Sequence, residues 1–377
     1  MKFVIAIDSF KGCMTSSEAG VAATEGIRRC IPDADIKVLP IADGGEGTVD
    51  ALVTAFDGEI KRVNVKDPLG RKIVAKYGVI GDTAVLEMAE ASGIALLKRE
   101  ELSPLAATTY GVGEMICDAV SSGCRKFIIG IGGSATNDAG IGMLSALGFE
   151  FLDKDGNVVP FGARALSKVS EICTDKVISE LFECEFKIAC DVTNPLTGDF
   201  GCSAVFSPQK GASDEDVKIM EAGMCHFAKV CKEKYPESDP DKAGAGAAGG
   251  LGFAFMTFLG GKLQSGIEMV LDEVRIEEYI KDADLVITGE GRVDSQTAMG
   301  KAPAGVAARA KKYGKPVVAV AGSTTRDANL CNAHGIDAIF PILRYPCSLS
   351  EAMEKENAMK NMADTAEQVS RLFAWGK

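Results

Sequence analysis

The chain has 377 residues, of which 46% are hydrophobic and 25% are charged. This composition is typical of a globular protein, and the length favours two domains over one. The formal net charge of −12 argues against a nucleic-acid-binding surface, because phosphate backbones require dense Lys and Arg, although a local group of cations and amides can still bind a small anion.

The cysteines and histidines argue against several kinds of site. The twelve cysteines are scattered without CxxC pairs, and we interpret them as reduced core residues of a cytoplasmic protein. Only two histidines are present, His226 and His334, so a zinc site or a Ser-His-Asp triad is not expected.

No segment predicts export or a membrane span. Met1 to Ile7 has the pattern of a strand and lacks the apolar region and cleavage site of a signal peptide. Ala243 to Gly261 is uncharged, but Gly and Ala dominate it and their burial gains little. We interpret it as a glycine-rich turn followed by a buried helix, and we expect neither a membrane nor nucleic acid as a partner.

The first fifty residues predict two strand-loop-helix units. A buried strand over 2–7 ends at Asp8, and Ser16 or Ser17 caps a helix over about 18–30. A second strand over 36–41 is followed by ADGGEGT and by a helix to about Phe56. Loops at the carboxyl ends of parallel strands converge on one crevice. The loops would place four charged residues there: Asp8, Lys11, Asp43 and Glu46.

These loop residues have simpler explanations as well. Asp8 and Glu46 could cap helices, and the glycines of ADGGEGT could serve turn geometry alone. We favour a functional role for Asp43 and Glu46, because acids beside a glycine pair are a poor choice for turn formation alone.

A change of periodicity near Gly58 predicts a domain boundary. Short alternating segments between Gly58 and Met88 are typical of an antiparallel meander. Strand-helix alternation returns after residues 276–280, with strands over 316–321 and 338–342, a helix after Ser323 and a terminal helix over 349–373. We predict a Rossmann-like parallel-sheet domain from residues 1–58 and 262–377, interrupted by a second α/β domain over 59–261.

A glycine-rich loop follows a buried strand over 126–130 inside the insertion. Gly132, Gly133 and Ser134 precede a helix of small residues, so their amides and hydroxyl could face a ligand at the helix start. Close packing of that helix is the alternative, and Asn137 with Asp138 favours ligand binding. The loop matches neither the Walker A pattern nor the dinucleotide GxGxxG fingerprint.

Two further stretches of the insertion end in polar or glycine-rich loops. A strand over 186–190 leads into Asp191, and residues 204–207 predict another strand. GAGAAGGLG, residues 244–252, could either close over a ligand or pack tightly.

The stretch over 284–303 has the composition of a phosphoryl-transfer site. A short strand over 285–287 breaks at Thr288, and Pro303 suits the first turn of a helix that ends near Lys312. Cations here attract oxyanions, acids can hold a divalent metal, and glycines allow close approach, although a wet turn alone could carry such residues. The residues concerned are Gly289, Glu290, Gly291, Arg292, Asp294, Gly300 and Lys301.

Five ordered motifs together resemble the glycerate kinase type 1 family of bacteria, without departure from its pattern. They are DSFKG (8–12), ADGGEGT (42–48), GIGGSATNDAG (130–140), CDVTNPLTG (190–198) and TGEGRVDSQTAMGKAP (288–303). The resemblance covers essentially the whole chain. It implies an ATP-dependent kinase for D-glycerate, a Rossmann-like domain interrupted by a second α/β domain, and magnesium as the divalent metal.

We hypothesise roles for these residues from the needs of phosphoryl transfer. The amides of Gly132, Gly133, Ser134, Gly289 and Gly291 cradle phosphates, with Asn137 nearby, and Lys301 and Arg292 offset their charge. Asp43, Glu46 and Glu290 hold the metal. Asp191 or Asp294 is the general base, and Lys11 or Arg292 holds the glycerate carboxylate.

Two other classes of protein also have two α/β domains. One is a non-catalytic protein that binds a small anion or sugar acid, but a binder of anions would avoid so many acids in its cleft. The other is a nucleotide-dependent dehydrogenase, which would carry a dinucleotide fingerprint after the first strand, where DSFKG stands instead. The sequence carries no indication of the oligomeric state.

Overall fold

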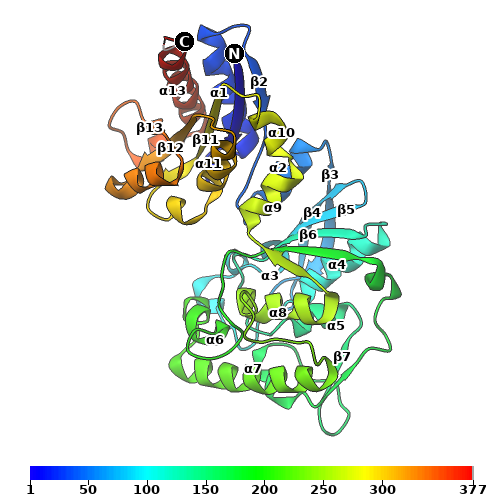
Figure 1. Ribbon diagram of the computed structural model, residues 1–377. Coiled ribbons are helices and arrows are strands. Elements are labelled where there is room, and N and C mark those ends of the chain that lie inside the picture. Colours follow the sequence, from blue (N-terminus) through cyan, green and yellow to red (C-terminus); the bar gives the residue numbers. More distant parts are fainter. Residues whose placement is uncertain (376–377) are drawn as a thin grey trace. The chain divides into compact units, whose positions relative to one another are not determined.

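A computed structural model describes residues 1–375, and the chain divides into two compact units (Figure 1). The first unit consists of Met1–Asp43, Asp50–Asp57 and Ile267–Lys377, and the second of Gly44–Val49 and Gly58–Gly266. The predicted domain boundaries, after residue 58 and at residue 262, stay a prediction.

The first unit contains a five-stranded, fully parallel sheet in the order β13-β12-β11-β1-β2. From β1 the chain adds β2 on one side of the sheet, and from β11 it adds β12 and β13 on the other side. The order of connection therefore switches between β1 and β11, and ligands of open α/β sheets bind at such a switch point. The predicted mixed α/β class with a Rossmann-like parallel sheet is confirmed. The strands are β1 (Lys2–Ile7), β2 (Asp35–Val38), β11 (Leu285–Val293), β12 (Val317–Thr324) and β13 (Ala338–Pro341).

Helices α1 and α13 pack side by side against one face of this sheet (Figure 1). Thr15, rather than Ser16 or Ser17, caps α1, because its hydroxyl accepts the Glu18 N–H while the Glu18 carboxylate accepts the Thr15 N–H. Ser16 instead donates its hydroxyl to the Ile7 carbonyl oxygen. The helices of this unit are α1 (Ser16–Cys30), α2 (Thr48–Ala55), α9 (Gly266–Glu273), α10 (Ile276–Ile280), α11 (Ala302–Lys312), α12 (Leu349–Ala352) and α13 (Lys355–Trp375).

Strand β11 is longer than its sequence suggests. The predicted break at Thr288 is wrong, since Glu290, Arg292 and Val293 continue the strand and pair with residues 321, 323 and 324 of β12. Pairing with β12 gives hydrogen-bond partners to backbone N–H and carbonyl groups of residues 288–293, although the glycines of this segment predict a turn. The predicted helix after Ser323 is a 3₁₀ helix over Arg326–His334, and the predicted terminal helix is divided into α12 and α13.

The second unit is built on a mixed sheet in the order β10-β9-β6-β5-β4-β3. The predicted antiparallel meander is confirmed, because β3, β4 and β5 pair antiparallel, whereas β5, β6, β9 and β10 run parallel. The strands are β3 (Glu59–Lys66), β4 (Lys72–Ile80), β5 (Thr83–Glu87), β6 (Lys126–Gly130), β9 (Glu185–Ala189), β10 (Lys262–Gln264) and the separate pair β7 (Glu150–Leu152) and β8 (Glu171–Cys173).

The helices of the second unit enclose its apolar core. The predicted strand over 204–207 is wrong: these residues belong largely to α6, and a short apolar run does not distinguish the two structures. The α-helices are α3 (Ala89–Ser92), α4 (Tyr110–Ser121), α5 (Ile141–Ala146), α6 (Cys202–Phe206), α7 (Asp214–Lys234) and α8 (Ala247–Leu259). Short 3₁₀ helices occupy Ile94–Leu96, Arg99–Glu101, Ala163–Lys168, Ser179–Glu183, Pro208–Lys210 and, in the first unit, Thr297–Met299.

The glycine-rich segment over 244–252 packs tightly. A Cβ added at Gly249 would lie 2.2 Å from the Thr136 carbonyl oxygen, and one at Gly252 would lie 2.2 Å from the Gly244 carbonyl oxygen. Of the two alternatives, the structure therefore favours close packing. Within residues 1–375, no helix has both the length and the apolar character needed to cross a membrane.

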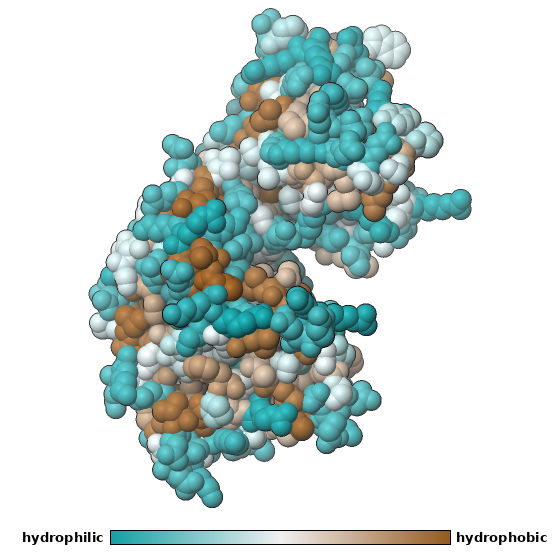
Figure 2. Space-filling model, turned by 180° about the vertical axis from the view of Figure 1, so that it is seen from behind, coloured by the Kyte–Doolittle hydropathy of each residue, from teal (hydrophilic) through white to brown (hydrophobic). Residues whose placement is uncertain are grey.

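One face of the molecule is largely hydrophilic (Figure 2), and the cysteines are free thiols. Hydrophilic side chains cover much of the face seen in Figure 2, with apolar patches between them. All twelve cysteines lie in the described part of the chain and are free thiols, as predicted, but only Cys124, Cys202, Cys231 and Cys331 are fully buried.

The contact between α1 and α13 depends on Gly26. A Cβ at this position would lie 1.9 Å from the Ala363 carbonyl oxygen, so Gly26→Ala must push the helices apart. Despite a gain in helix propensity, we expect a loss of ~1–3 kcal/mol in the free energy of unfolding, measured in urea. Val21→Ala on the exposed face of α1 is the control and should change it by less than ~0.5 kcal/mol. Equal stability of the two variants would contradict this packing.

Candidate functional site

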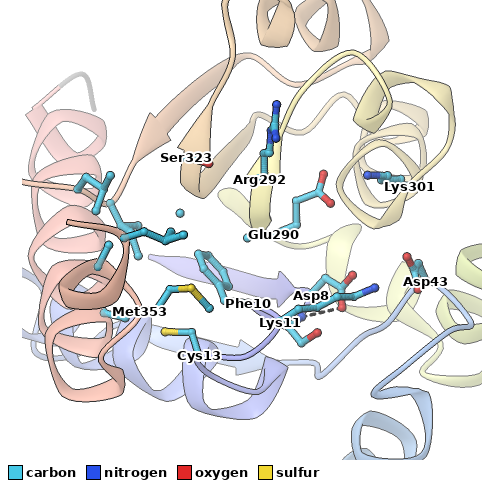
Figure 3. A pocket seen from close by; sticks show the side chains of 18 residues that line it. Asp8, Phe10, Lys11, Cys13, Asp43, Glu290, Arg292, Lys301, Ser323 and Met353 are labelled. Atoms are coloured by element: carbon cyan, nitrogen blue, oxygen red, sulfur yellow. Dashed lines mark hydrogen bonds between the residues drawn. The ribbon is translucent and has the colours of Figure 1, made fainter. Parts of the chain in front are cut away.

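A cavity of about 390 Å³ opens in the first unit at the carboxyl ends of β1 and β11. This is the switch point of the parallel sheet. Charged side chains gather at one end of the cavity and apolar ones at the other (Figure 3). The charged and polar residues that line it are Asp8, Ser9, Lys11, Asp43, Glu290, Arg292, Lys301 and Ser323.

Asp8 follows β1 directly and is only 5% exposed. Burial, together with the negative charges of Asp43 and Glu290, raises the pKa of Asp8 to about 7, although the Ser9 N–H, which donates to its carboxylate at 2.6 Å, acts in the opposite direction. A carboxyl group of this kind is poised to exchange a proton near neutral pH. The sequence indicates the position of Asp8 at the strand end, but the hypothesised roles leave it out.

Glu290 lies in the extension of β11 and is 8% exposed. The Thr297 hydroxyl donates to its carboxylate at 2.5 Å and so fixes its orientation. Burial raises the pKa of Glu290, and nearby Asp294 and Asp43 act in the same direction, whereas Thr297 and Lys301 oppose the rise. Two buried acids in one cavity favour a cation between them, because a divalent ion relieves their repulsion.

The three predicted cations lie around this charged end in different ways. Lys301 is the N-cap residue of α11 and is half-buried, and Lys11 stands exposed on the loop after β1. The Arg292 side chain is 65% exposed, lies 3.5 Å from the Asp294 carboxylate and extends away from Glu290 (Figure 3). Lys301 and Lys11 are thus better placed than Arg292 to act inside the cavity.

Two residues of the same stretch have local structural functions. Gly289 lies within the sheet, where a Cβ would come 2.1 Å from the Val320 carbonyl oxygen, so strand packing explains this glycine. Asp294 accepts the Gln296 N–H at 2.9 Å and begins the turn that carries Thr297 to Glu290. Gly291 differs from Gly289 in that it lines the cavity.

The second unit presents its own group of predicted residues at the carboxyl ends of β6 and β9. Gly132 and Gly133 are exposed, but they lie several residues before α5 begins at Ile141, so the predicted position at a helix start is wrong. Asp138 accepts the Gly140 and Gly142 N–H groups where this loop meets α5. Asp191 is exposed beyond β9, and its carboxylate accepts the Gly266 N–H at 3.0 Å.

Asn137 and Asp138 are fully buried beneath this loop. The Asn137 amide donates to the Ser203 hydroxyl at 3.1 Å, and Asp138 accepts the Thr109 N–H and hydroxyl as well as the Gly140 N–H. Burial raises the pKa of Asp138 despite these donors. Both side chains hold the loop in place through buried hydrogen bonds, so a structural role explains their presence without a ligand.

Two charged residues that lie outside the five sequence motifs support these loops. Lys210 is 2% exposed and donates to the Ser134 hydroxyl at 2.8 Å and the Thr136 carbonyl oxygen at 2.6 Å, and burial lowers its pKa to about 8. Glu87, at the end of β5, accepts the Gly47 and Val49 N–H groups at 3.1 and 2.9 Å. The position of Glu87 at the end of a strand is the sequence signal that could have identified this residue.

The predicted residues fall into two groups, one in each unit. Around the cavity of the first unit lie Lys11, Asp43, Glu290, Gly291, Arg292 and Lys301. The second unit carries Glu46, Gly132, Gly133, Ser134, Asn137 and Asp191. Among residues 1–375, no three His, Cys, Asp or Glu side chains are grouped closely enough to hold a metal by themselves. Mg²⁺ commonly takes only one or two carboxylates together with substrate phosphates, so Asp43 and Glu290 remain suitable ligands.

A parallel sheet with acids, cations and exposed backbone at its strand ends is typical of an enzyme that handles phosphate. The glycerate kinase family model matches residues 3–374, and the chain belongs to this family. It is 46% identical to the glycerate kinase of Haemophilus influenzae and to the glycerate 2-kinase of Escherichia coli, in each case over 100% of this chain and 99% of the relative. The crystal structure of a putative glycerate kinase 2 from Salmonella typhimurium superimposes with a TM-score of 0.92 at 44% identity, over 100% of this chain and 99% of that one.

The raised pKa of Asp8 predicts a pH-dependent stability. In the folded chain Asp8 keeps its proton up to a pKa of about 7, whereas the usual value is 3.8, so the folded state binds more protons between these values and loses stability as the pH rises. Asp8→Asn removes this titration. Its free energy of unfolding, relative to the wild type, should therefore rise by ~2–4 kcal/mol between pH 4 and pH 8.

Urea unfolding at several pH values measures this difference. Val21→Ala, at an exposed side chain that does not ionise, is the control, and its difference from the wild type should not change with pH. The same pH-independent difference for both variants would contradict the buried, protonated state of Asp8.

Proposed function

We propose that this protein is an ATP-dependent glycerate kinase, which transfers the γ-phosphoryl group of ATP to a hydroxyl of D-glycerate. The observation that carries the proposal is full-length membership of the glycerate kinase family, combined with a cavity of acids and cations at the switch point of a parallel sheet. The name of the Escherichia coli relative, glycerate 2-kinase, supports phosphorylation of the 2-hydroxyl. Membership of a kinase family counts against a non-catalytic binding protein and against a dehydrogenase.

Magnesium is the divalent metal that we propose for this reaction, and it would neutralise charge on the transferring phosphates. In the first unit Asp43 and Glu290 would hold it, and burial of Glu290 among other acids fits a cation at this place. Glu46 is the third ligand predicted from the motifs, and it is exposed and belongs to the second unit.

The remaining roles follow from charge and exposure. In the first unit Lys301, with Arg292, offsets phosphate charge, Gly291 supplies backbone, and Lys11 or Arg292 binds the glycerate carboxylate, whereas Gly289, predicted to share the role of Gly291, is paired within the sheet. In the second unit the exposed backbone of Gly132 and Gly133, with Ser134, is proposed to cradle phosphate, while buried Asn137 supports it. The free thiols support a reducing, cytoplasmic compartment.

The general base remains one of a few carboxylates. Asp191 and Asp294 are the bases predicted from the motifs, and Asp8 joins them because its pKa near 7 suits proton acceptance at neutral pH. Asp191 is the most exposed of the three, and Asp294 is already engaged by Gln296 and Arg292.

A coupled assay of ADP release tests the function directly. With ATP, Mg²⁺ and D-glycerate, we expect turnover within the usual enzyme range of about 1–1000 per second, and far slower turnover with other hydroxy acids and with sugar acids. NMR of the product should place the phosphate on the 2-hydroxyl. A higher kcat/KM for a different acid would replace glycerate as the substrate, and no ADP release with any acid would overturn the proposal.

Isosteric amides identify the base. Asp191→Asn, Asp294→Asn and Asp8→Asn keep the side-chain shape, so the variant at the base position should lose ~10²–10⁴-fold in kcat. Circular dichroism should show an intact fold, and Asp33→Asn on the surface should keep wild-type turnover. Wild-type kcat in all three variants would remove these carboxylates from the proton transfer.

A further inference from the structure

The apolar end of the cavity in the first unit has no part in the roles described above. It is formed by the loop after β1, the segment after β13 and the start of the terminal helices (Figure 3). Its side chains are Phe10, Cys13, Ile342, Leu343, Leu349 and Met353. None of the five sequence motifs covers the segment from 342 to 353.

Several of these apolar side chains are left open to water. Leu349 is 76% exposed, Met353 39% and Leu343 37%, although all three line the same cavity. Such a group of exposed apolar side chains in a concave site favours a ligand with an apolar surface, because covering them releases water.

The charged end of the same cavity restricts the kind of ligand. Lys11 and Lys301 attract an anionic group, and the carboxylates of Asp43 and Glu290 suit its metal. A single occupant must therefore carry a flat apolar part and an anionic part. Glycerate does not fit this description, since each of its three carbons bears oxygen.

Backbone forms the floor between the two ends. A Cβ at Gly322 would lie 2.5 Å from the Gly291 carbonyl oxygen, so these strands are close together, whereas a Cβ at Gly291 would find its nearest atom at 3.5 Å. Gly291 therefore presents bare backbone to the cavity, and Ser323, which pairs with the next residue of β11, Arg292, lines the same cavity. Bare backbone and a hydroxyl suit a polar connecting group such as ribose.

We propose that the adenine base of ATP binds at the apolar end of this cavity, against Phe10, Leu349 and Met353. The ribose crosses Gly291 and Gly322, and the phosphates extend toward Lys301. This assignment rests on the proposed function, deepens it by locating the nucleotide, and assigns the terminal segment 342–353 to nucleotide recognition.

A double variant, Leu349→Ser with Met353→Ser, tests the base contacts without adding charge. We expect ADP with Mg²⁺ to bind about tenfold more weakly by calorimetry, and the KM for ATP to rise by a similar factor. The KM for D-glycerate should change less than about twofold. Leu372→Ser, at a 61% exposed leucine of α13 outside the cavity, is the matched control and should bind ADP as the wild type does.

Inorganic tripolyphosphate separates base from phosphate recognition. It lacks a base, so its affinity should be equal in the wild type and the double variant. Unchanged ADP affinity in the double variant, or an equal loss for tripolyphosphate, would overturn the assignment. Because ADP binding is measured without glycerate, failure of the proposed reaction would show itself separately as wild-type protein that binds ADP but does not phosphorylate glycerate.

Cys13 offers a readout that needs no variant. Its thiol is half-buried at the apolar end, and Cys30 at the end of α1 is half-buried outside the cavity. Saturating ADP should slow alkylation of Cys13, followed by mass spectrometry, and leave Cys30 unchanged. Equal rates at Cys13 with and without ADP would contradict a base bound against this end.

Discussion

Carboxyl groups buried at the ends of two neighbouring parallel strands are the constraint on which the first unit depends. Asp8 and Glu290 are each less than one-tenth exposed, and charge repulsion among them and Asp43 adds to the cost of burial. A protein tolerates this only if the groups hold a proton or face a cation. The parallel sheet imposes the arrangement, because its switch point brings the ends of β1 and β11 together.

In the second unit, the main feature is exposed loop backbone, as at Gly132 and Gly133, that buried groups hold in position. Buried charged groups support its loops through hydrogen bonds, from Lys210 to the Ser134 hydroxyl and from the Gly47 N–H to Glu87. Such internal supports cost desolvation, which multiple hydrogen bonds offset. These hydrogen bonds hold the loops in position, which favours a preorganised anion site.

Much of this architecture could be predicted from periodicity and strand-end motifs. Asp43, Glu290 and Lys301 were placed together correctly because parallel strands bring their following loops to one edge. Long-range pairing could not be predicted: the extension of β11 depends on β12, whose own extension has no local signal. The position of the 132–134 loop was wrong for a similar reason, since Asp138 and Gly140 delay the start of α5.

Burial also separates structural from functional polar residues in ways that sequence does not reveal. Asn137 looks like a ligand-binding residue in its motif, yet it is fully buried. The apolar end of the cavity was missed for the opposite reason, because Leu349 and Met353 resemble ordinary residues of a terminal helix. Only their exposure within a concave site indicates a role.

The central claim is that the buried acids of the first unit form the cation-binding end of a nucleotide site. Calorimetric binding of ADP with Mg²⁺ near pH 7, in buffers of different ionisation enthalpy, counts the protons exchanged on binding. We predict net release of protons, because a bound cation forces Asp8 into its charged form, and we predict that Asp8→Asn reduces it. Binding without proton release in the wild type would contradict the claim.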